Sequence, residues 1–169
     1  MQLRPLHMVM ARHSFPCSLY AHCLGNGATP RITITTHLTH SDRQVWYLGG
    51  QIAEEGITRS APDQTAKARA ELTALFPWLD FSDVEFASFL VDRAEARQPS
   101  LNRPDSFSLQ ESANYLVAWP TKLVLAPLLA EHILNKLGAT AIKTGSADLR
   151  ALRAWPVPAF ARPMWEQLF

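Results

Sequence analysis

Five consecutive residues, Trp119-Pro120-Thr121-Lys122-Leu123, carry the strongest sequence signal for binding chemistry. A short apolar stretch before them, residues 115–119, predicts a buried strand, and a helical pattern that opens at Pro120-Thr121 runs to about Leu137. Amide groups at a helix start have no partner inside the helix and attract negative charge. The pyrimidine carbonyl of a flavin gains negative charge on reduction and would be stabilised beside such amides. Lys122 would add a formal positive charge. The alternative is an ordinary capped helix with an exposed lysine.

A second candidate site consists of arginines in or beside a proline-containing loop. Arg93, Arg97 and Arg103 lie there, with Asp92 and Asp105 nearby. A guanidinium group binds a carboxylate through two parallel hydrogen bonds, so Arg97 and Arg103 are the leading candidates for binding a substrate anion. The alternative is a solvated loop in which the arginines pair with the aspartates.

Histidine and cysteine offer a weaker hypothesis of metal or nucleophile chemistry. His22, His37 and His40 could form a metal-dependent hydrolase site. However, residues three apart in a strand point to opposite faces, which separates His37 from His40. His22 and Cys23 diverge for the same reason, since they are adjacent in a predicted strand. We therefore predict no metal site, and the sequence identifies no catalytic residue.

The elements that must position these residues are strands followed by helices. Residues 31–39 and 44–52 alternate β-branched and aromatic residues around a turn and predict an antiparallel hairpin. Glycines 49 and 50 inside the return strand indicate a bulge or a close backbone approach. Residues 60–76 form the clearest amphipathic helix, with Ser60 as its cap. Further strands are expected at residues 3–12, 18–24 and 84–97.

This order of elements favours an α+β fold. Strands mostly follow one another instead of alternating with helices, which predicts a largely antiparallel mixed sheet with helices packed on one face. The chain of 169 residues has 47% hydrophobic and 18% charged residues, as a globular domain does. We expect residues 1–138 to form the domain and residues 139–169 to be a tail packed on its surface.

Charge and composition exclude several classes of partner. The net charge is only +1, so we expect no nucleic-acid partner. The longest apolar stretch, residues 116–129, is interrupted by two prolines and a lysine, so we expect no membrane span. Two cysteines and the absence of a signal-like apolar segment predict a cytoplasmic protein. Gly25-Asn26-Gly27 lacks the third glycine of a dinucleotide-binding fingerprint.

Four segments, in the same order as in the family, resemble the D-amino-acid oxidase and glycine oxidase superfamily. Residues 114–127 resemble its closing strand, turn and helix with an Ala-Pro pair, and that turn lies against the flavin ring. Residues 45–56 resemble a strand at the end of the central part of the substrate domain. The other two segments are residues 4–9 and Arg97-Gln98-Pro99 with Asp105.

The resemblance implies that the chain is a substrate domain without most of the FAD-binding half. It implies an FAD-dependent oxidoreductase acting on an amine, an amino acid or a hydroxy compound, with residues 119–123 near the cofactor and Arg97 and Arg103 near the substrate. The FAD-binding half would be supplied in cis or in trans, and the chain alone would bind FAD poorly and be inactive. The alternative is a non-catalytic dimerisation or protein-interaction domain, to which Trp155 and Trp165 would contribute.

Overall fold

The computed structural model describes residues 1–27, 29–97, 106–139, 145 and 150–169. Contacts within the chain define two compact units, which we name after their β-structure. The sheet unit comprises Pro5–Arg93 and Ala161–Phe169, and the hairpin unit comprises Met1–Arg4 and Ala94–Phe160. These units divide the chain differently from the predicted domain boundary at residue 138, which stays a prediction.

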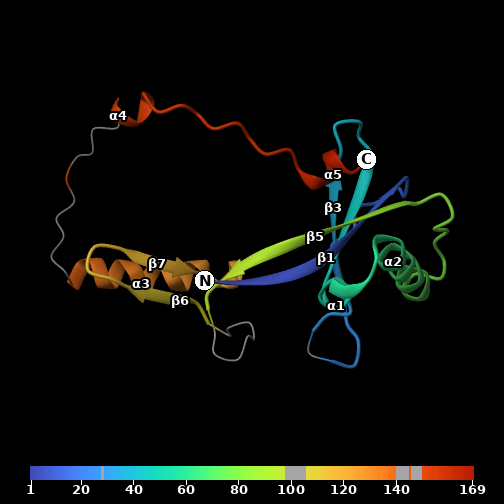
Figure 1. The fold of residues 1–169 in the computed structure, drawn as a ribbon, viewed down its shortest axis with the longest axis horizontal. Coiled ribbons are helices and arrows are strands. Elements are labelled where there is room, and N and C mark those ends of the chain that lie inside the picture. The colour runs from blue at the N-terminus through green and yellow to red at the C-terminus, as the bar shows by residue number, and fades with distance from the viewer. Residues whose placement is uncertain (28, 98–105, 140–144, 146–149) are drawn as a thin grey trace. The chain divides into compact units, whose positions relative to one another are not determined.

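The sheet unit is built around a five-stranded sheet with the order β2-β3-β4-β1-β5 (Figure 1). The strands are β1 (Gln2–His13), β2 (Ala21–Cys23), β3 (Ile32–Leu38), β4 (Gln44–Gly49) and β5 (Glu85–Glu95). β3 pairs with β4, β4 with β1 and β2 with β3, all in the antiparallel sense. The predicted hairpin is therefore confirmed, as is the largely antiparallel sheet of a mixed α and β fold.

The return strand of the hairpin ends earlier than the sequence predicted. β4 stops at Gly49, and residues predicted as strand up to Ile52 instead enter α1 (Gln51–Glu55) and the 3-10 helix η1 (Gly56–Thr58). Gly50 causes the change of direction, because it adopts φ 86°, a left-handed conformation that favours glycine. A Cβ atom there would lie 2.6 Å from the carbonyl oxygen of Pro30, so the expected close backbone approach is present.

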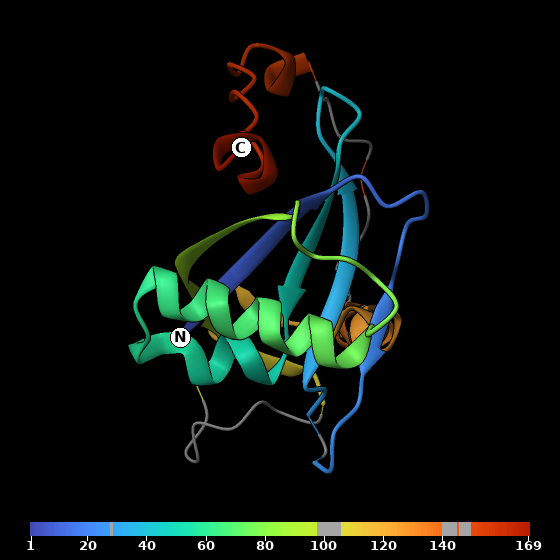
Figure 2. The same ribbon diagram turned by 90° about the vertical axis from the view of Figure 1, so that its right-hand side faces the viewer.

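Helix α2 (Ala61–Leu75) covers one face of this sheet and closes the core, as Figure 2 shows. Its predicted cap is confirmed, because the Ser60 hydroxyl accepts a hydrogen bond from the Asp63 amide at 3.3 Å. Ala68 and Leu72 are fully buried against the strands. The other buried members of this core are Val9, Ala11, Ile32, Ile34, Trp46, Leu48, Ile52, Phe81 and Val84.

The second face of the sheet has different residues and a different cover. Strand side chains alternate between faces, so Tyr47 points away from its core neighbours Trp46 and Leu48. Tyr47 lies opposite Met10 of β1 and Thr35 of β3. The short helix α5 (Met164–Gln167) lies on this side, opposite α2 (Figure 1). Helices therefore occupy both faces in part, and α2, together with Ile52 of α1, belongs to the main core.

The hairpin unit contains a two-stranded sheet and one longer helix. Its elements are β6 (Ser108–Glu111), β7 (Leu116–Trp119), the 3-10 helix η2 (Leu123–Leu125), α3 (Ala126–Ala139) and α4 (Arg150–Arg153). β6 and β7 pair antiparallel, and an ion pair between Lys136 of α3 and Glu111 of β6 joins helix to hairpin. The sequence predicted the second strand but missed the first.

Two predictions about the hairpin unit are wrong. The helix predicted from Pro120 begins at Ala126, which places Pro127 in the first turn, where a missing amide is tolerated. The strand predicted as buried is half-buried or exposed, with Leu116 at 36% exposure. Among the described helices of the whole chain, none has the length and apolar character needed to cross a membrane.

Candidate functional site

The predicted cofactor-contacting residues form a sharp turn between β7 and η2. Thr121 adopts φ 59°, a left-handed conformation that is unusual for a β-branched residue. Its hydroxyl donates to the carbonyl oxygens of Ser106 at 2.9 Å and of Pro120 at 2.7 Å. The Lys122 amide also donates to the Pro120 carbonyl, at 2.6 Å. These bonds hold the turn, so that Lys122 follows in extended conformation before η2 begins.

Free helix amides contribute less to this turn than the sequence predicted. The amides of Leu125 and Ala126 are used within the 3-10 turn, donating to Lys122 and Leu123 respectively. Pro127 has no amide hydrogen to offer. The charge of Lys122 is a further source of favourable electrostatics for an electron-rich group at this turn.

Apolar side chains beside the turn are open to solvent. Leu123 is 88% exposed and Val124 is 79% exposed, while Trp119, Thr121 and Lys122 are half-buried. A flat aromatic ring system such as a flavin needs an accessible apolar surface and, near its pyrimidine edge, a positive charge. The turn offers both, so its residues fit this cofactor.

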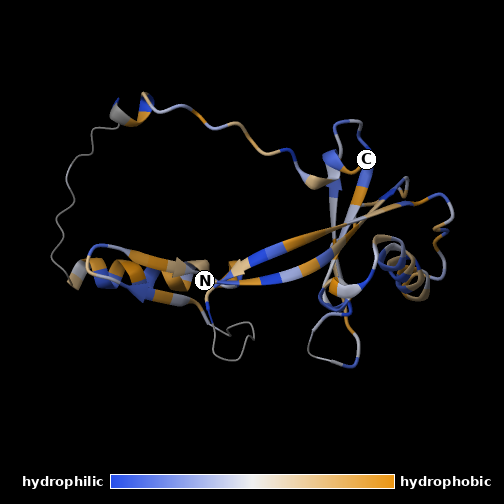
Figure 3. Ribbon diagram, in the orientation of Figure 1, coloured by the Kyte–Doolittle hydropathy of each residue, from blue (hydrophilic) through white to orange (hydrophobic). Residues whose placement is uncertain are grey.

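Exposed apolar side chains in the hairpin unit are not confined to the turn. In Figure 3 much of α3 has the colour of hydrophobic residues. Only Ala96 and Leu129 are buried hydrophobic residues among those described in this unit. Between residues 115 and 137 the large exposed hydrophobic residues are Tyr115, Leu116, Leu123, Val124, Leu128, Leu134 and Leu137, which we call the hairpin apolar surface.

The predicted substrate arginines are only partly described. Arg97 lies two residues after the end of β5 and is exposed, and the described residues give it no ion pair. Arg103 lies outside the described residues, as does most of the loop between them. Whether the two guanidinium groups converge on one anion therefore stays a prediction.

The three histidines of the metal hypothesis have different surroundings. His37 stacks on Trp165 with ring centroids 4.0 Å apart, whereas His40 hydrogen-bonds to Glu166. His22 is an exposed residue of the edge strand β2. Burial lowers the pKa of His37, which favours its neutral form. Within the described ranges no three ligand-type side chains form a metal-binding group.

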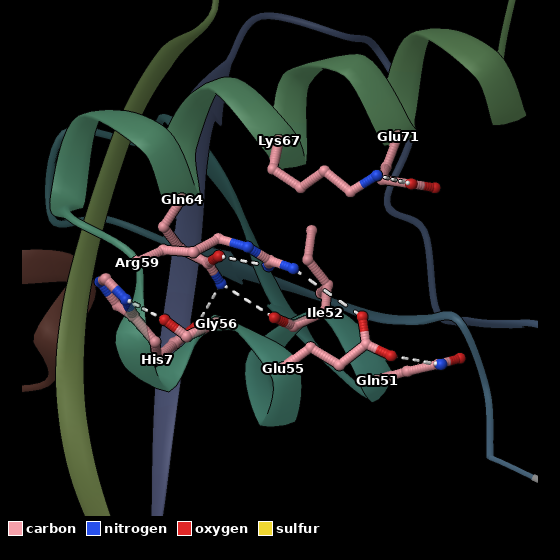
Figure 4. Close-up of polar contacts among 9 residues, drawn as sticks. All are labelled: His7, Gln51, Ile52, Glu55, Gly56, Arg59, Gln64, Lys67 and Glu71. Atoms are coloured by element: carbon pink, nitrogen blue, oxygen red, sulfur yellow. Dashed lines mark hydrogen bonds and ion pairs between the residues drawn. The ribbon is translucent and has the colours of Figure 1, made fainter.

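A buried polar network in the sheet unit was not found from the sequence (Figure 4). The amide nitrogen of Gln64, a residue with 0% exposure, donates to the carbonyl oxygens of His7 at 2.8 Å and Ile52 at 3.0 Å. Its amide oxygen accepts from Arg59 at 3.0 Å. A Cβ atom on Gly56 would lie 2.3 Å from the Gln64 amide, so a larger residue there would displace that side chain from its hydrogen bonds. Helix periodicity alone gives no signal for such a residue.

A cleft of about 320 Å³ beside this network is lined by charged side chains that are already paired. Glu71 contacts Arg31 and also Lys67, the latter at 2.8 Å, and Arg59 lies 3.8 Å from Glu55. Burial raises the pKa of Glu71, but hydrogen bonds and charge from Lys67 and Arg31 outweigh this and leave it below the ordinary value. The pairing indicates a structural ion cluster.

The chain was compared with known proteins. No family model matches it. It is 48% identical over 170 aligned positions to the probable FAD-dependent oxidoreductase PA4991 of Pseudomonas aeruginosa. The match covers 100% of this chain but 43% of that protein. The chain therefore spans less than half the length of the curated relative that it matches.

A solved structure gives the same result. The crystal structure of the FAD dependent oxidoreductase PA4991 from Pseudomonas aeruginosa matches with a TM-score of 0.84 and 47% identity, over 97% of this chain and 45% of that one. The sequence match and the structure match are to the same protein, and both cover nearly all of this chain. The chain is thus homologous to a part of a protein named as an FAD-dependent oxidoreductase.

Proposed function

We propose that this chain is the substrate-domain part of an FAD-dependent oxidoreductase of the D-amino-acid oxidase and glycine oxidase superfamily. The observation that carries the proposal is its 48% identity, over its whole length, to part of a protein named as a probable FAD-dependent oxidoreductase. The complete protein would act on an amine, an amino acid or a hydroxy compound. FAD, when bound, would accept the hydride removed from the carbon that bears the nitrogen or oxygen.

The exposed residues of the hairpin apolar surface support the proposal that a partner polypeptide supplies the FAD-binding half. Leucine side chains at 67% (Leu134) and 88% (Leu123) exposure gain about 25 cal/mol for each Å² that a partner covers. Large contiguous apolar patches on a soluble protein are typical of interaction surfaces. The relative is more than twice as long as the stretch matched here, so the same polypeptide could provide that partner.

In the assembled protein, Trp119, Pro120, Thr121, Lys122 and Leu123 would contact the flavin. The apolar side chain of Leu123 would give the ring a surface, and Lys122 would place positive charge near it. The Thr121 hydroxyl would keep the turn in shape through its bond to Ser106. Arg97 and Arg103 would bind a negatively charged group of the substrate.

A spectrum of the purified chain, alone and joined to the unmatched part of the Pseudomonas relative, tests this proposal. The chain alone should be colourless, because most of the FAD site would be missing. The joined protein should carry about one FAD per molecule and should be reduced by an amine, amino acid or hydroxy compound. Stoichiometric FAD on the isolated chain would contradict the claim of incompleteness, and a flavin-free joined protein of native fold would contradict the proposal itself.

The role of the turn is tested with Lys122→Ala in the joined protein. Loss of one favourable charge near the ring should weaken FAD binding by about tenfold, since 1.4 kcal/mol corresponds to that factor. Lys67→Ala, which lies in the sheet unit and pairs with Glu71, is the matched control and should leave FAD binding unchanged. Equal effects of the two substitutions would remove Lys122 from the cofactor site.

A second candidate function is a non-catalytic dimerisation domain. It is favoured by the exposed apolar residues of the tail, with Trp155 at 71%, Val157 at 86% and Phe160 at 96% exposure. Light scattering after size-exclusion chromatography distinguishes the two candidates. A concentration-dependent dimer that Phe160→Ser abolishes would favour this function, and a monomer at high concentration would count against it. A cytoplasmic location likewise stays a prediction, which cell fractionation would check.

A further inference from the structure

Residues 161–169 lie on the second face of the sheet, the face that α2 does not cover. We call them the 161–169 strap. They belong to the sheet unit although residues 94–160 do not, so the chain returns to this unit after the hairpin unit. The strap contains α5, a helix of only four residues, without a side-chain cap.

Three contacts place the strap on β3, the turn that follows it, and β1. The indole of Trp165 stacks on the imidazole of His37, with centroids 4.0 Å apart and planes at 15°. The Glu166 carboxylate accepts hydrogen bonds from His40, at 2.6 Å from its amide and 2.8 Å from Nδ1. The Arg12 guanidinium lies 4.8 Å from the centre of the Phe169 ring.

These contacts can be released without disturbing the main core. None of the strap residues is a buried member of the core clusters, and the side chain of His40 is 86% exposed. A four-residue helix is not stable by itself in water, so its shape depends on this docking. Segments held by a few contacts outside the core open at a low free-energy cost compared with global unfolding.

Trp165 ends a row of rings that crosses the second face. Phe89 and Tyr47 have centroids 6.1 Å apart, and Tyr47 meets His37 edge-on at 6.0 Å. The neighbours of Tyr47 across the strands, Met10 and Thr35, are uncharged. A flat ring stacked on His37 therefore meets one end of this row of aromatic rings.

We propose that the second face is a binding surface for a planar aromatic group, and that Trp165 of the strap occupies it in the resting state. The position on His37 accepts an indole in nearly parallel stacking, which is the geometry an aromatic ligand would adopt. An aromatic molecule and the strap would then compete for one position. The strap would act as a cover that lifts when the ligand binds.

The competition can be measured on the full chain without flavin, so its outcome is independent of the proposed oxidoreductase function. Free indole is the probe, and side-chain NMR signals of His37 and Tyr47 report its position. Trp165→Ala empties the position and should bind indole about fivefold more tightly than the natural chain, since a stacked aromatic pair contributes about 1 kcal/mol. Trp155→Ala, which removes an exposed tryptophan from the same tail, is the matched control and should behave as the natural chain.

A second variant tests the same competition in case Trp165→Ala disturbs the local fold. Glu166→Gln keeps the indole but weakens the charge-assisted contact with His40, so it should also strengthen indole binding, by a smaller factor. Hydrogen exchange should rise in residues 161–169 in both variants while the β4 core amides stay protected. The proposal is overturned if indole binds both variants no more tightly than the natural chain, or if the shifted signals lie away from His37 and Tyr47.

Discussion

The two units of this chain differ in how completely their own residues bury their hydrophobic side chains. The sheet unit buries Trp46, Leu48 and Leu72 at 2% exposure or less, and it satisfies its buried Gln64 with three hydrogen bonds. In the hairpin unit, Leu129 at 6% exposure is the one large hydrophobic side chain buried among those described. The first unit therefore has a core of its own, whereas the second presents an apolar surface that another polypeptide could cover.

This difference indicates where stability and function are separated in the molecule. Burial of apolar area is the main driving force of folding, so the sheet unit should carry most of the measurable stability. The hairpin unit, with the proposed cofactor turn, should gain its final stability on assembly with the FAD-binding half. The predictions below test that separation, beginning with the largest effect.

Removal of the central core ring should unfold the sheet unit most readily. Trp46→Ala leaves a cavity among Phe15, Phe76 and Phe81, which contact the indole ring. The expected loss is about 3–5 kcal/mol in the free energy of unfolding, measured by urea denaturation. Trp78→Ala is the control, because that ring is 74% exposed, and it should change stability by less than about 0.5 kcal/mol. Equal losses would show that the core is not where we place it.

Acid should weaken the same unit through His13. Burial, with a smaller effect from Arg43, lowers the pKa of His13 from 6.5 to about 4. Since the folded state holds the proton less well than the unfolded state, this contribution is complete above pH 6.5 and is lost as the pH falls toward 4. The loss should reach at most about 3 kcal/mol.

Urea denaturation between pH 4 and 7 would measure this slope. His13→Phe keeps a ring against Trp46 and Phe15 but cannot take up a proton, so its stability should vary less with pH over this range. An unchanged slope in His13→Phe would assign the acid sensitivity to other groups, such as His37.

The polar network should show strong coupling between Gly56 and Gln64. Gly56→Ala places a methyl group 2.3 Å from the Gln64 amide and should cost about 2–3 kcal/mol, through overpacking and displaced hydrogen bonds. Gln64→Ala removes the clashing amide, so the double variant should be more stable than the sum of the two losses predicts. A double-mutant cycle measures the difference, and strict additivity would contradict the contact.

The smallest effect on the isolated chain should come from the hairpin apolar surface. Leu134→Asp changes a side chain that is 67% exposed, so urea denaturation of the chain should shift by less than about 0.5 kcal/mol. In the protein joined to the FAD-binding half, the same charge would be buried without a partner, and FAD content should fall sharply. Glu131→Gln, also exposed and on α3, is the control that should preserve FAD content.

Sequence patterns predicted those elements whose signals are local. The β3–β4 hairpin and helix α2 follow from alternation, helical spacing and the Ser60 cap, each of which depends on neighbouring residues. The prediction that the return strand continued to Ile52 was wrong because Gly50 turns the backbone. Ile52 instead contacts α2, since its carbonyl oxygen accepts a hydrogen bond from Gln64.

Predictions that depended on tertiary contacts were less accurate. The residues around Pro120 looked like a helix start, but the left-handed Thr121 and the 3-10 turn delay α3 until Ala126. An apolar sequence such as residues 115–119 cannot reveal whether its cover lies in the same polypeptide. Gln64 and the strap contacts of Trp165 join residues far apart in sequence, and one sequence without related sequences carries no signal for them.

The β6–β7 ribbon has a practical consequence for work with the chain by itself. Both strands of this two-stranded sheet are edge strands. Each has backbone donors and acceptors on its outer side that no third described strand satisfies. Such edges invite strand addition from another molecule. Concentrated solutions of the chain should therefore be prone to edge-to-edge aggregation that begins at residues 108–119 and leaves the tryptophan environment of the larger sheet intact.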